Sequence, residues 1–347
     1  MLAEEKYMMR CIELAQNGLG HVTPNPMVGA VIVHDEKIIG EGFHGQFGEA
    51  HAEVNAINNA VAKYGEDILQ RSSIYVNLEP CSHFGKTPPC TDLILKKKIP
   101  HVVIGCADPF DQVKGAGIKK LLSGGVRVIQ NFCEKECRDL NKRFLTFHEK
   151  KRPYIILKYA QSLDGFIAPQ TVTEQNRWIT NEYSQTLVHK WRSEEQAIMI
   201  GTNTAKNDNP FLTVREWKGK NPVRIVIDRE LKVDVMHNIY DLSAPTLIYN
   251  DVKNETEKKH EFVRIDFKAN ILHQVLSSLH EKNILSVIVE GGTKLLQSFI
   301  DENCWDEARI FTGNKFLESG IKAPGINGKI ISRENIFNDT LLILKPK

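Results

Sequence analysis

The chain has 347 residues, of which 41% are hydrophobic and 25% are charged, and its formal net charge is +2. This composition is typical of a soluble globular protein with one large domain or two smaller ones. The near balance of charge requires no strongly basic surface, so nucleic acid is not an expected partner.

The chain shows no signal for a membrane or a secretory pathway. No apolar run approaches the ~20 residues that cross a bilayer, so no membrane segment is expected. Residues 1–10 contain two glutamates and lack the apolar core of a signal peptide. Seven cysteines are an odd number without the density of a disulfide scaffold, which indicates a reduced, cytoplasmic protein.

Strands and helices alternate along the first half of the chain. Apolar residues at helical spacing predict helices at 4–16, 51–63, 91–98, 118–122 and 132–150. Apolar runs bounded by turn residues predict strands at 28–33, 37–43, 73–78, 101–106 and 126–129. This alternation predicts an α/β domain whose sheet carries helices on both faces.

A metal-ligand pattern lies between residues 51 and 90. His51 and Glu53 are followed by Pro80-Cys81 and then by Cys90. One imidazole and two thiols are ligands that zinc prefers, and three protein ligands leave a fourth position open, as in catalytic sites. A His-x-Glu followed by Pro-Cys and a second Cys is the signature of zinc-dependent deaminases. The residues therefore predict one zinc ion held by His51, Cys81 and Cys90, with Glu53 as the catalytic acid and base.

The positions of these ligands favour a site over a coincidence. Cys81 and Cys90 both follow prolines, so both are expected to begin helices, where the positive end of the helix dipole favours a thiolate. Ligands that follow strands and enter helices match the usual location of sites in α/β sheets. The alternative interpretation is two buried cysteines and an unrelated core histidine.

The second half begins after a charged segment at 149–153, which places the domain boundary between 1–149 and 150–347. Glu290-Gly291-Gly292 lies between an apolar strand and a helix predicted at 294–300. Such a turn is compatible with a dinucleotide, because glycines admit a ligand and a helix N-terminus favours phosphate. It lacks the three-glycine fingerprint, however. The 201–204 segment follows a strand at 197–200 and is either a second binding turn or a simple turn.

The first half carries four motifs in order: Thr-Pro-Asn-Pro-x-Val-Gly at 23–29, a histidine at 44, His-Ala-Glu at 51–53 and Glu-Pro-Cys-Ser-His-Phe-Gly-Lys-Thr-Pro-Pro-Cys at 79–90. With these motifs it resembles the deaminase domain of the bifunctional deaminase–reductase family of riboflavin biosynthesis. Eight residues separate the two cysteines, whereas nucleoside and tRNA deaminases have two. The resemblance implies a cytidine-deaminase-like α/β/α sandwich. It also implies contacts to the pyrimidine and phosphoribosyl parts of the substrate from Asn25, His44, His83 and Lys86.

The second half carries a series of motifs at 158–165, 177–180, 201–204, 208–210, 212–215 and 287–292. With these motifs it resembles the reductase domain of the same family, which has a dihydrofolate-reductase-like α/β fold. The resemblance implies that NADPH is bound by Lys158, Ala160, Trp178, Thr204, Asp208, Gly291 and Gly292. It implies that the substrate is bound by Arg192, Leu212, Arg215 and Glu290, and that Lys158 and Asp164 lie near the reacting sugar. The chain departs from the family at Asn176, where relatives often carry serine, and in the glycine-free loop at 168–173, so the substrate contact there stays open.

Together these features predict two consecutive reactions on a phosphoribosylated pyrimidine. The first domain would use zinc to deaminate 2,5-diamino-6-(5-phosphoribosylamino)pyrimidin-4(3H)-one, with Lys86 on its phosphate. The second would use NADPH to reduce the ribosyl group to ribityl phosphate, with Arg192 and Arg215 on the phosphate. A homodimer or higher homo-oligomer is the usual state of a soluble enzyme.

Three alternatives stay open at this point. The first is a deaminase with an inactive reductase-like domain, for which the departure at Asn176 is the reason. The second is a nucleoside or nucleic-acid deaminase with an appended domain. The third is a zinc-stabilised binding module without catalysis.

Overall fold

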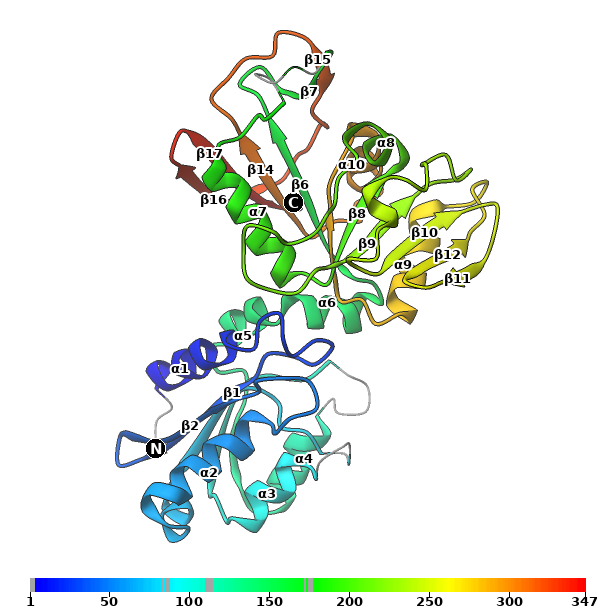
Figure 1. The fold of residues 1–347 in the computed structure, drawn as a ribbon. Helices are drawn as coiled ribbons and strands as arrows, with labels where there is room; N and C mark the ends of the chain where they lie inside the picture. Colours follow the sequence, from blue (N-terminus) through cyan, green and yellow to red (C-terminus); the bar gives the residue numbers. More distant parts are fainter. Residues whose placement is uncertain (1–3, 83, 85–87, 110–114, 172, 174–176) are drawn as a thin grey trace. The chain divides into compact units, whose positions relative to one another are not determined.

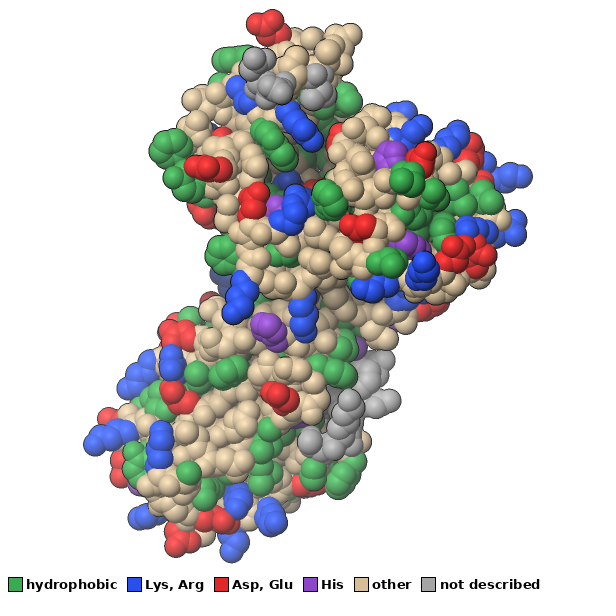
Figure 2. All heavy atoms as spheres, viewed as in Figure 1, with side chains coloured by type: hydrophobic (Ala, Val, Ile, Leu, Met, Phe, Trp, Pro, Cys, Tyr) green, Lys and Arg blue, Asp and Glu red, His purple; other side chains and the backbone are tan. Residues whose placement is uncertain are grey.

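The structure is a computed structural model that describes residues 4–82, 84, 88–109, 115–171, 173 and 177–347. His83, Lys86 and Asn176 lie outside these described residues. Contacts divide the chain into two compact units, Met1–Lys151 and Arg152–Lys347 (Figure 1). Within the described ranges, no helix has the length and apolar character needed to cross a bilayer. Basic and acidic side chains are interspersed over the visible face of each unit (Figure 2), in keeping with the net charge of +2.

The first unit is built on a five-stranded sheet with the order β2-β1-β3-β4-β5. Its strands are β1 (Gly29–His34), β2 (Lys37–Phe43), β3 (Ser73–Leu78), β4 (His101–Cys106) and β5 (Arg127–Ile129). β1 is antiparallel to β2 and β3, whereas β3, β4 and β5 are parallel. Asp35 and Glu36 join β1 to β2 with φ of 44° and 60°, which is the two-residue turn that matches the twist of a hairpin.

Helices cover both faces of this sheet. α2 (Ala52–Tyr64), α3 (Cys90–Lys96) and α4 (Ala116–Ser123) pack on one face, and α1 (Glu5–Gln16) and α5 (Glu134–Leu140) on the other (Figure 1). α2 lies very close to β2, since a Cβ on Gly40 or Gly42 would lie 2.4 Å from the backbone of Ala56. This close approach fixes the start of α2, where two of the predicted site residues lie.

The helix predicted at 132–150 is wrong, because Asn141 divides it into α5 and α6 (Lys142–Lys150). The Asn141 side chain turns to the loop before β1, where its Oδ1 accepts from the Met27 N–H at 2.9 Å and its Nδ2 donates to the Met27 carbonyl at 2.9 Å. A local hydrophobic stripe cannot reveal a break that a distant segment stabilises.

The second unit contains a ten-stranded sheet with the order β11-β12-β10-β9-β8-β13-β6-β14-β17-β16. The parallel strands are β6 (Tyr154–Gln161), β8 (Ala197–Gly201), β9 (Val223–Ile227), β10 (Thr246–Asn250), β12 (His260–Arg264), β13 (Ser286–Val289) and β14 (Glu307–Thr312). The antiparallel strands at its two edges are β11 (Glu255–Glu257), β16 (Lys329–Ile336) and β17 (Asp339–Lys345). β7 (Phe166–Pro169) and β15 (Gly320–Lys322) form a separate pair.

Two hydrophobic cores lie on the two faces of this large sheet. α7 (Glu182–Glu194) and α8 (Thr202–Asp208) contribute to one core, and α9 (Ile271–Glu281) and α10 (Thr293–Asp301) to the other. The parallel strands all end at the same edge of the sheet. Ligands of open α/β sheets bind at that edge, and four of the eleven residues predicted for the second site follow the ends of β8 and β13, namely Thr204, Glu290, Gly291 and Gly292.

Candidate active sites

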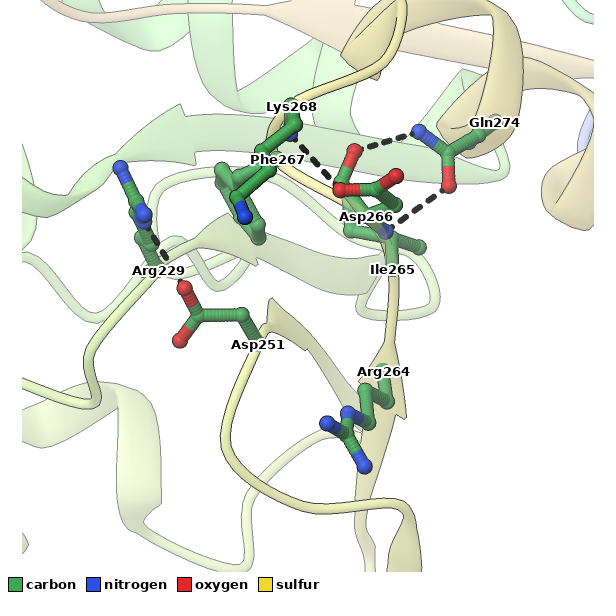
Figure 3. Close-up of a pocket in the computed structure, with 8 residues that line it drawn as sticks. All are labelled: Arg229, Asp251, Arg264, Ile265, Asp266, Phe267, Lys268 and Gln274. Carbon is green, nitrogen blue, oxygen red and sulfur yellow. Dashed lines mark hydrogen bonds and ion pairs between the residues drawn. The ribbon is translucent and has the colours of Figure 1, made fainter.

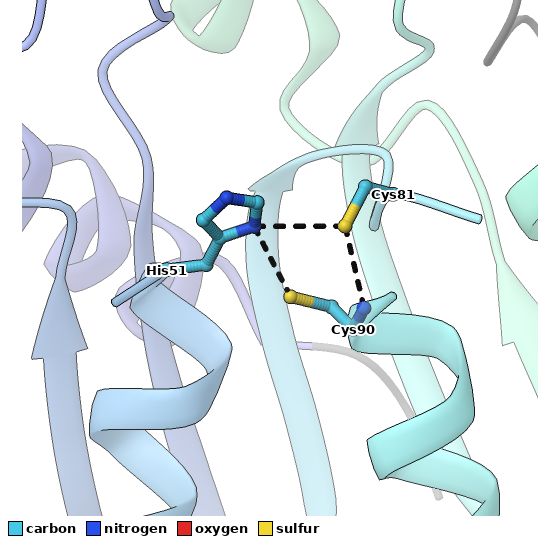
Figure 4. Close-up of side chains that lie close together, drawn as sticks. All are labelled: His51, Cys81 and Cys90. Atoms are coloured by element: carbon cyan, nitrogen blue, oxygen red, sulfur yellow. Dashed lines mark hydrogen bonds between the residues drawn. The ribbon is translucent and has the colours of Figure 1, made fainter. Parts of the chain in front are cut away.

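The three predicted zinc ligands converge at one point of the first unit (Figure 4). His51 immediately precedes α2, Cys81 lies in the loop after β3, and Cys90 is the first residue of α3. The His51 Nδ1 lies 3.5 Å from the Cys81 Sγ and 3.3 Å from the Cys90 Sγ. Tetrahedral zinc, with bonds of about 2.0–2.1 Å to nitrogen and 2.3 Å to sulfur, places such atoms about 3.6 Å apart. The residues therefore fit a zinc ion with three protein ligands.

Only one of the two cysteines begins a helix, so the expectation that both do is wrong for Cys81. The start of α3 nevertheless serves both sulfurs, because the Cys90 backbone N–H donates to the Cys81 Sγ at 3.3 Å. The hydrogen bonds from Cys90 and His51 lower the pKa of Cys81 to about 4, against the opposing effect of burial. Thiolates are the form that binds metal, so the Cys81 sulfur is prepared for a cation.

Glu53 lies in the first turn of α2 with 3% of its surface exposed. Burial is the main cause that raises the pKa of its carboxyl group, and the neighbouring Cys81 sulfur adds to it. The neighbouring His51 and Cys90 act in the opposite direction, but burial outweighs them. A carboxyl group with a raised pKa can accept and return protons close to neutral pH.

Asn25 and His44 form a hydrogen-bonded pair beside the ligand cluster. The His44 Nδ1 lies 3.1 Å from the Ala50 carbonyl, and its Nε2 lies 3.1 Å from the Asn25 Nδ2. Since a carbonyl only accepts, the Nδ1 carries the proton and the Nε2 accepts from Asn25. Burial lowers the pKa of His44, which keeps this ring neutral. The ring centroids of His44 and His51 are 5.6 Å apart, so His44 lies next to a metal ligand and Asn25 is hydrogen-bonded to His44.

Two asparagines that the sequence did not single out hold the loop that carries Asn25. Asn77 is fully buried, and its Oδ1 accepts from the Gly29 N–H at 2.7 Å while its Nδ2 donates to the Met27 carbonyl at 3.0 Å. Asn141 donates to the same Met27 carbonyl and also accepts from the Met27 N–H. A polar residue inside the apolar strand 73–78 was the available signal for Asn77.

Glu79 is a third residue whose role the sequence did not reveal, although it belongs to the Glu-Pro-Cys motif. Its carboxylate is 4% exposed and accepts four backbone N–H groups. Oε1 accepts from Gly117 at 3.0 Å and Ile118 at 3.2 Å, and Oε2 accepts from Gly115 at 3.0 Å and Asp108 at 3.3 Å. The start of α4 is thereby attached to the segment that leads into Cys81.

A buried charge cluster lies at the carboxyl edge of the second sheet. Glu290 follows β13, and its carboxylate lies 3.1 Å from the Arg192 Nη2 of α7 and 3.6 Å from the Lys158 Nζ of β6. The side chains of Lys158, Arg192 and Glu290 are 15%, 11% and 12% exposed. Burial lowers the pKa of Lys158, whereas Arg192 and Lys158 together hold the pKa of Glu290 below its ordinary value against the effect of burial. These residues were predicted for the cofactor and substrate, and the structure brings them together.

Arg215 and His189 extend this cluster on the α7 side. The Arg215 N–H donates to the His189 Nδ1 at 3.2 Å. Burial and the nearby Arg192 lower the pKa of Arg215. Burial, Arg192 and Arg215 together lower the pKa of His189. Two guanidinium groups that repel each other in a partly buried place favour an anion between them. His189 was not predicted, because one histidine on a helix gives no distinctive signal.

The glycine turn after β13 contacts α8. The Gly292 N–H donates to the Thr204 Oγ1 at 3.1 Å. Gly291 has φ of +115°, and a Cβ at this position would lie 2.7 Å from the same Oγ1. The turn therefore requires glycine, which leaves its backbone accessible to a ligand.

The remaining predicted residues are placed less tightly. Trp178 is 57% exposed, and Leu212 is buried with φ of +56°. Ala160 is half-buried on β6, and Asp208 is exposed at the end of α8. Asp164 accepts from the Ser162 hydroxyl and from the backbone of 317 and 318, so its carboxylate holds this loop. The roles of these residues in a site stay predictions.

Comparison with known families agrees with this geometry. Residues 1–106 match the cytidine and deoxycytidylate deaminase zinc-binding region, and residues 153–325 match the RibD C-terminal domain. Fold and ligand cluster thus define a zinc-dependent deaminase domain followed by a reductase domain.

Full-length relatives share both domains. The riboflavin biosynthesis protein RibD of Aquifex aeolicus is 36% identical over 99% of this chain and 98% of its own length. RibD of Bacillus amyloliquefaciens is 41% identical over 93% of this chain and 87% of its own length. The crystal structure of the Thermotoga maritima deaminase/reductase has a TM-score of 0.89 at 37% identity, covering 99% of this chain and 98% of that one. Acinetobacter baumannii RibD has a TM-score of 0.88 at 30% identity and the same coverage.

The chain belongs to the RibD family of bifunctional riboflavin-biosynthesis enzymes, which combine a zinc-dependent deaminase with an NADPH-dependent reductase. The predicted fold class, enzyme class and cofactors, zinc and NADPH, are thereby confirmed.

Proposed function

We propose that the first unit deaminates 2,5-diamino-6-(5-phosphoribosylamino)pyrimidin-4(3H)-one and that the second unit then reduces the ribosyl group of the product to ribityl. The observation that carries this proposal is the convergence of one imidazole and two sulfurs beside a buried carboxyl group. The name of the Thermotoga maritima relative, a diaminohydroxyphosphoribosylaminopyrimidine deaminase and 5-amino-6-(5-phosphoribosylamino)uracil reductase, supports the choice of substrate.

In the deaminase site, His51, Cys81 and Cys90 hold zinc. Zinc bound there supplies a Lewis acid that lowers the pKa of a water molecule toward neutrality. Glu53 takes the proton of the attacking water and passes protons to the ring nitrogen and the departing amine. Its buried position and raised pKa suit this exchange.

Asn25 and His44 orient the pyrimidine in this site. Their mutual hydrogen bond fixes both side chains, and the Asn77 and Asn141 contacts fix the loop beneath them. Because the bond is made by the Asn25 Nδ2, the amide oxygen faces the substrate as an acceptor for a donor group on the pyrimidine. His83 and Lys86 remain proposed contacts, with Lys86 on the phosphate.

In the reductase site, the Glu290 carboxylate pairs with both Arg192 and Lys158 and so holds these two side chains in place. Arg192 and Arg215 bind the phosphate of the ribosyl group, since a guanidinium can bind phosphate oxygens bidentately. Lys158 lies next to Glu290, and its lowered pKa would make it a better proton donor to the sugar oxygen; NADPH bound in this site would supply the hydride. NADPH itself is held by the Gly291-Gly292 turn and Thr204, with Ala160, Trp178 and Asp208 completing the site and Leu212 contacting the substrate.

A two-part assay on the purified chain tests this function. With the diaminopyrimidine substrate, zinc-loaded protein releases ammonia, and added NADPH is then oxidised with loss of its absorbance. Release of ammonia from cytidine or a tRNA anticodon, and not from this substrate, would instead support the nucleoside or nucleic-acid alternative. Ammonia release without NADPH oxidation would leave an enzyme active in deamination alone.

The setting of the enzyme is proposed on general grounds. All seven cysteines are free thiols, which supports a cytoplasmic protein. A homo-oligomer follows from the usual behaviour of soluble enzymes, and sedimentation equilibrium measures it directly.

A further inference from the structure

The loop between α8 and β9 is attached to α7 through one buried histidine. His189 lies on α7 with 5% of its surface exposed, and its Nδ1 accepts a hydrogen bond from the Arg215 backbone N–H at 3.2 Å. The preceding N–H, that of Val214, donates at 2.9 Å to the Oδ1 of Asn221, which belongs to the same loop. Of these two bonds, only the one to His189 connects the loop to the helix that carries Arg192.

This bond requires a neutral imidazole. A backbone N–H only donates, so the Nδ1 is the acceptor and the proton of the ring is on the Nε2. Burial and the charges of Arg192 and Arg215 lower the pKa of His189, and the opposite effects of Glu216 and Glu290 do not offset them. The ring is thereby kept in the form that can accept from the loop.

The two arginines near His189 have unused hydrogen-bond donors. The Arg192 Nε is buried and has no hydrogen-bond partner among the described residues. The Arg215 guanidinium donates to the Thr213 hydroxyl at 3.3 Å and forms no ion pair in the part of the chain that the structure describes. Arg229, which follows β9, shows the contrasting case, since its Nε lies 2.8 Å from the Asp251 Oδ2 (Figure 3). Buried or partly buried donors without a carboxylate suit an anionic ligand.

The approach of the two guanidinium groups needs an attachment that they do not supply themselves. His189 and Arg192 are three residues apart on α7, so they lie on the same face of the helix. Arg192 lowers the pKa of Arg215, which is the effect of a like charge nearby. Because like charges repel, the Arg215 side chain is not drawn to Arg192 by its own charge. The backbone bond to His189 holds the residue there instead.

We propose that His189 is a positioning residue of the reductase, which holds Arg215 beside Arg192 so that both guanidinium groups bind one substrate phosphate. The proposal rests on the proposed function, which assigns these two arginines to the phosphate of the ribosyl group. In this role His189 acts through the Arg215 backbone and not by contact with the reacting atoms.

Two replacements of His189 separate the hydrogen bond from the packing of the ring. The amide oxygen of asparagine is attached at the same side-chain position as the histidine Nδ1 and also accepts an N–H, whereas leucine places a methyl group there that cannot. NADPH oxidation with the deaminated intermediate supplied is the assay. His189→Leu raises the KM for the intermediate at least about tenfold, which corresponds to about 1.4 kcal/mol. His189→Asn keeps this KM within about threefold of the unaltered chain, because the acceptor remains.

The KM for NADPH stays unchanged in both variants, because a change confined to one KM marks lost binding of that ligand. His273→Leu is the matched control, since His273 is an exposed histidine of α9, and it leaves both KM values unchanged. Where the leucine variant melts below the assay temperature, His189→Ala provides the same loss of the acceptor. An unchanged KM for the intermediate in the variant without an acceptor overturns the proposal. Equal rises in the KM values for the intermediate and NADPH overturn it as well.

A double-mutant cycle with Arg215→Ala separates this inference from the proposed function. Arg215→Ala alone raises the KM for the intermediate by about tenfold or more, since a charged hydrogen bond is lost. Adding His189→Leu changes this KM by less than about twofold, because the positioned side chain is already absent. Full multiplication of the two effects would show that His189 acts independently of Arg215, which overturns the inference alone. An unchanged KM in Arg215→Ala refutes the phosphate assignment of the proposed function, and the role of His189 falls with it.

Discussion

Replacing Glu79 by glutamine tests whether the hydrogen bonds of its carboxylate stabilise the loop that carries the zinc ligand Cys81. Glutamine has nearly the same volume and keeps one acceptor, so the Gly117 and Ile118 N–H groups retain their partner. The amide NH₂ would then face the N–H groups of Asp108 and Gly115, which lose their acceptor. Hydrogen bonds to a charged group contribute about 1.5–3 kcal/mol each, so the loss of two destabilises the first unit by about 3 kcal/mol or more.

Scanning calorimetry of the zinc-loaded chain measures this change. For a unit of this size, 1 kcal/mol shifts the melting temperature by about 2–4 °C, so Glu79→Gln lowers the transition of the first unit by roughly 6–12 °C. The transition of the second unit stays in place. Weaker zinc retention is expected as well, because Glu79 stands two residues before Cys81.

Asp92→Asn is the matched control for this experiment. Asp92 is also an acidic residue of the first unit, and its carboxylate pairs with Lys120 at 2.5 Å, but it is 38% exposed. Exposed pairs contribute about 0–1 kcal/mol, so this change shifts the transition by no more than about 4 °C. If Glu79→Gln melts within the same range as Asp92→Asn, the four N–H contacts do not support the loop and the reasoning is wrong.

Four further results are expected. Glu53→Gln lowers ammonia release from the diaminopyrimidine by about 10²–10⁴-fold but leaves zinc content unchanged, as well as NADPH oxidation measured with the deaminated intermediate supplied; near-normal ammonia release would exclude Glu53 as the proton carrier. Removal of zinc by a chelator abolishes ammonia release but not NADPH oxidation with the supplied intermediate, and a loss of that NADPH oxidation would contradict two independent sites. Gly291→Ala raises the KM for NADPH because the new Cβ would lie 2.7 Å from the Thr204 Oγ1. Gly201→Ala leaves this KM unchanged, because a Cβ there has no atom within 4 Å. Equal KM values in the two variants would contradict the role of the Gly291-Gly292 turn in binding NADPH. Burial lowers the pKa of His189, so the unaltered chain loses stability as the pH falls below the unfolded-state pKa of about 6.5. Urea unfolding at pH 7.5 and 5.5 therefore shows a smaller loss of stability for His189→Gln than for the unaltered chain. Equal losses would mean that His189 is already charged in the folded chain.

Local patterns in the first half predicted most of its elements. The strands at 37–43, 73–78 and 101–106 have the predicted bounds, because each is an apolar run closed by turn or charged residues. The break at Asn141 could not be predicted in the same way. Its partner, Met27, lies 114 residues away in the chain, and no window of sequence contains both.

In the candidate sites, too, the sequence predicted residue types but not contacts between distant segments. The Glu-Pro-Cys motif contains Glu79 but does not reveal its four N–H partners, which lie at the start of α4 and in the segment before it. The Pro-Cys pair likewise suggested a helix start at Cys81, where the structure has a loop. His189 gave no signal at all, since its significance comes from the two arginines around it.

The sequence by itself determined the chemistry of this protein: an imidazole, two thiols and a carboxyl group in the order of a zinc deaminase, followed by the motifs of a reductase. Tertiary structure alone decided that the His51 nitrogen lies within 3.5 Å of both sulfurs, and that Glu290 meets Lys158 and Arg192. The physical reason is that residue types are fixed locally by the chain, whereas distances between side chains of remote segments, and the pKa values that burial sets, exist only after the sheets and helices have packed.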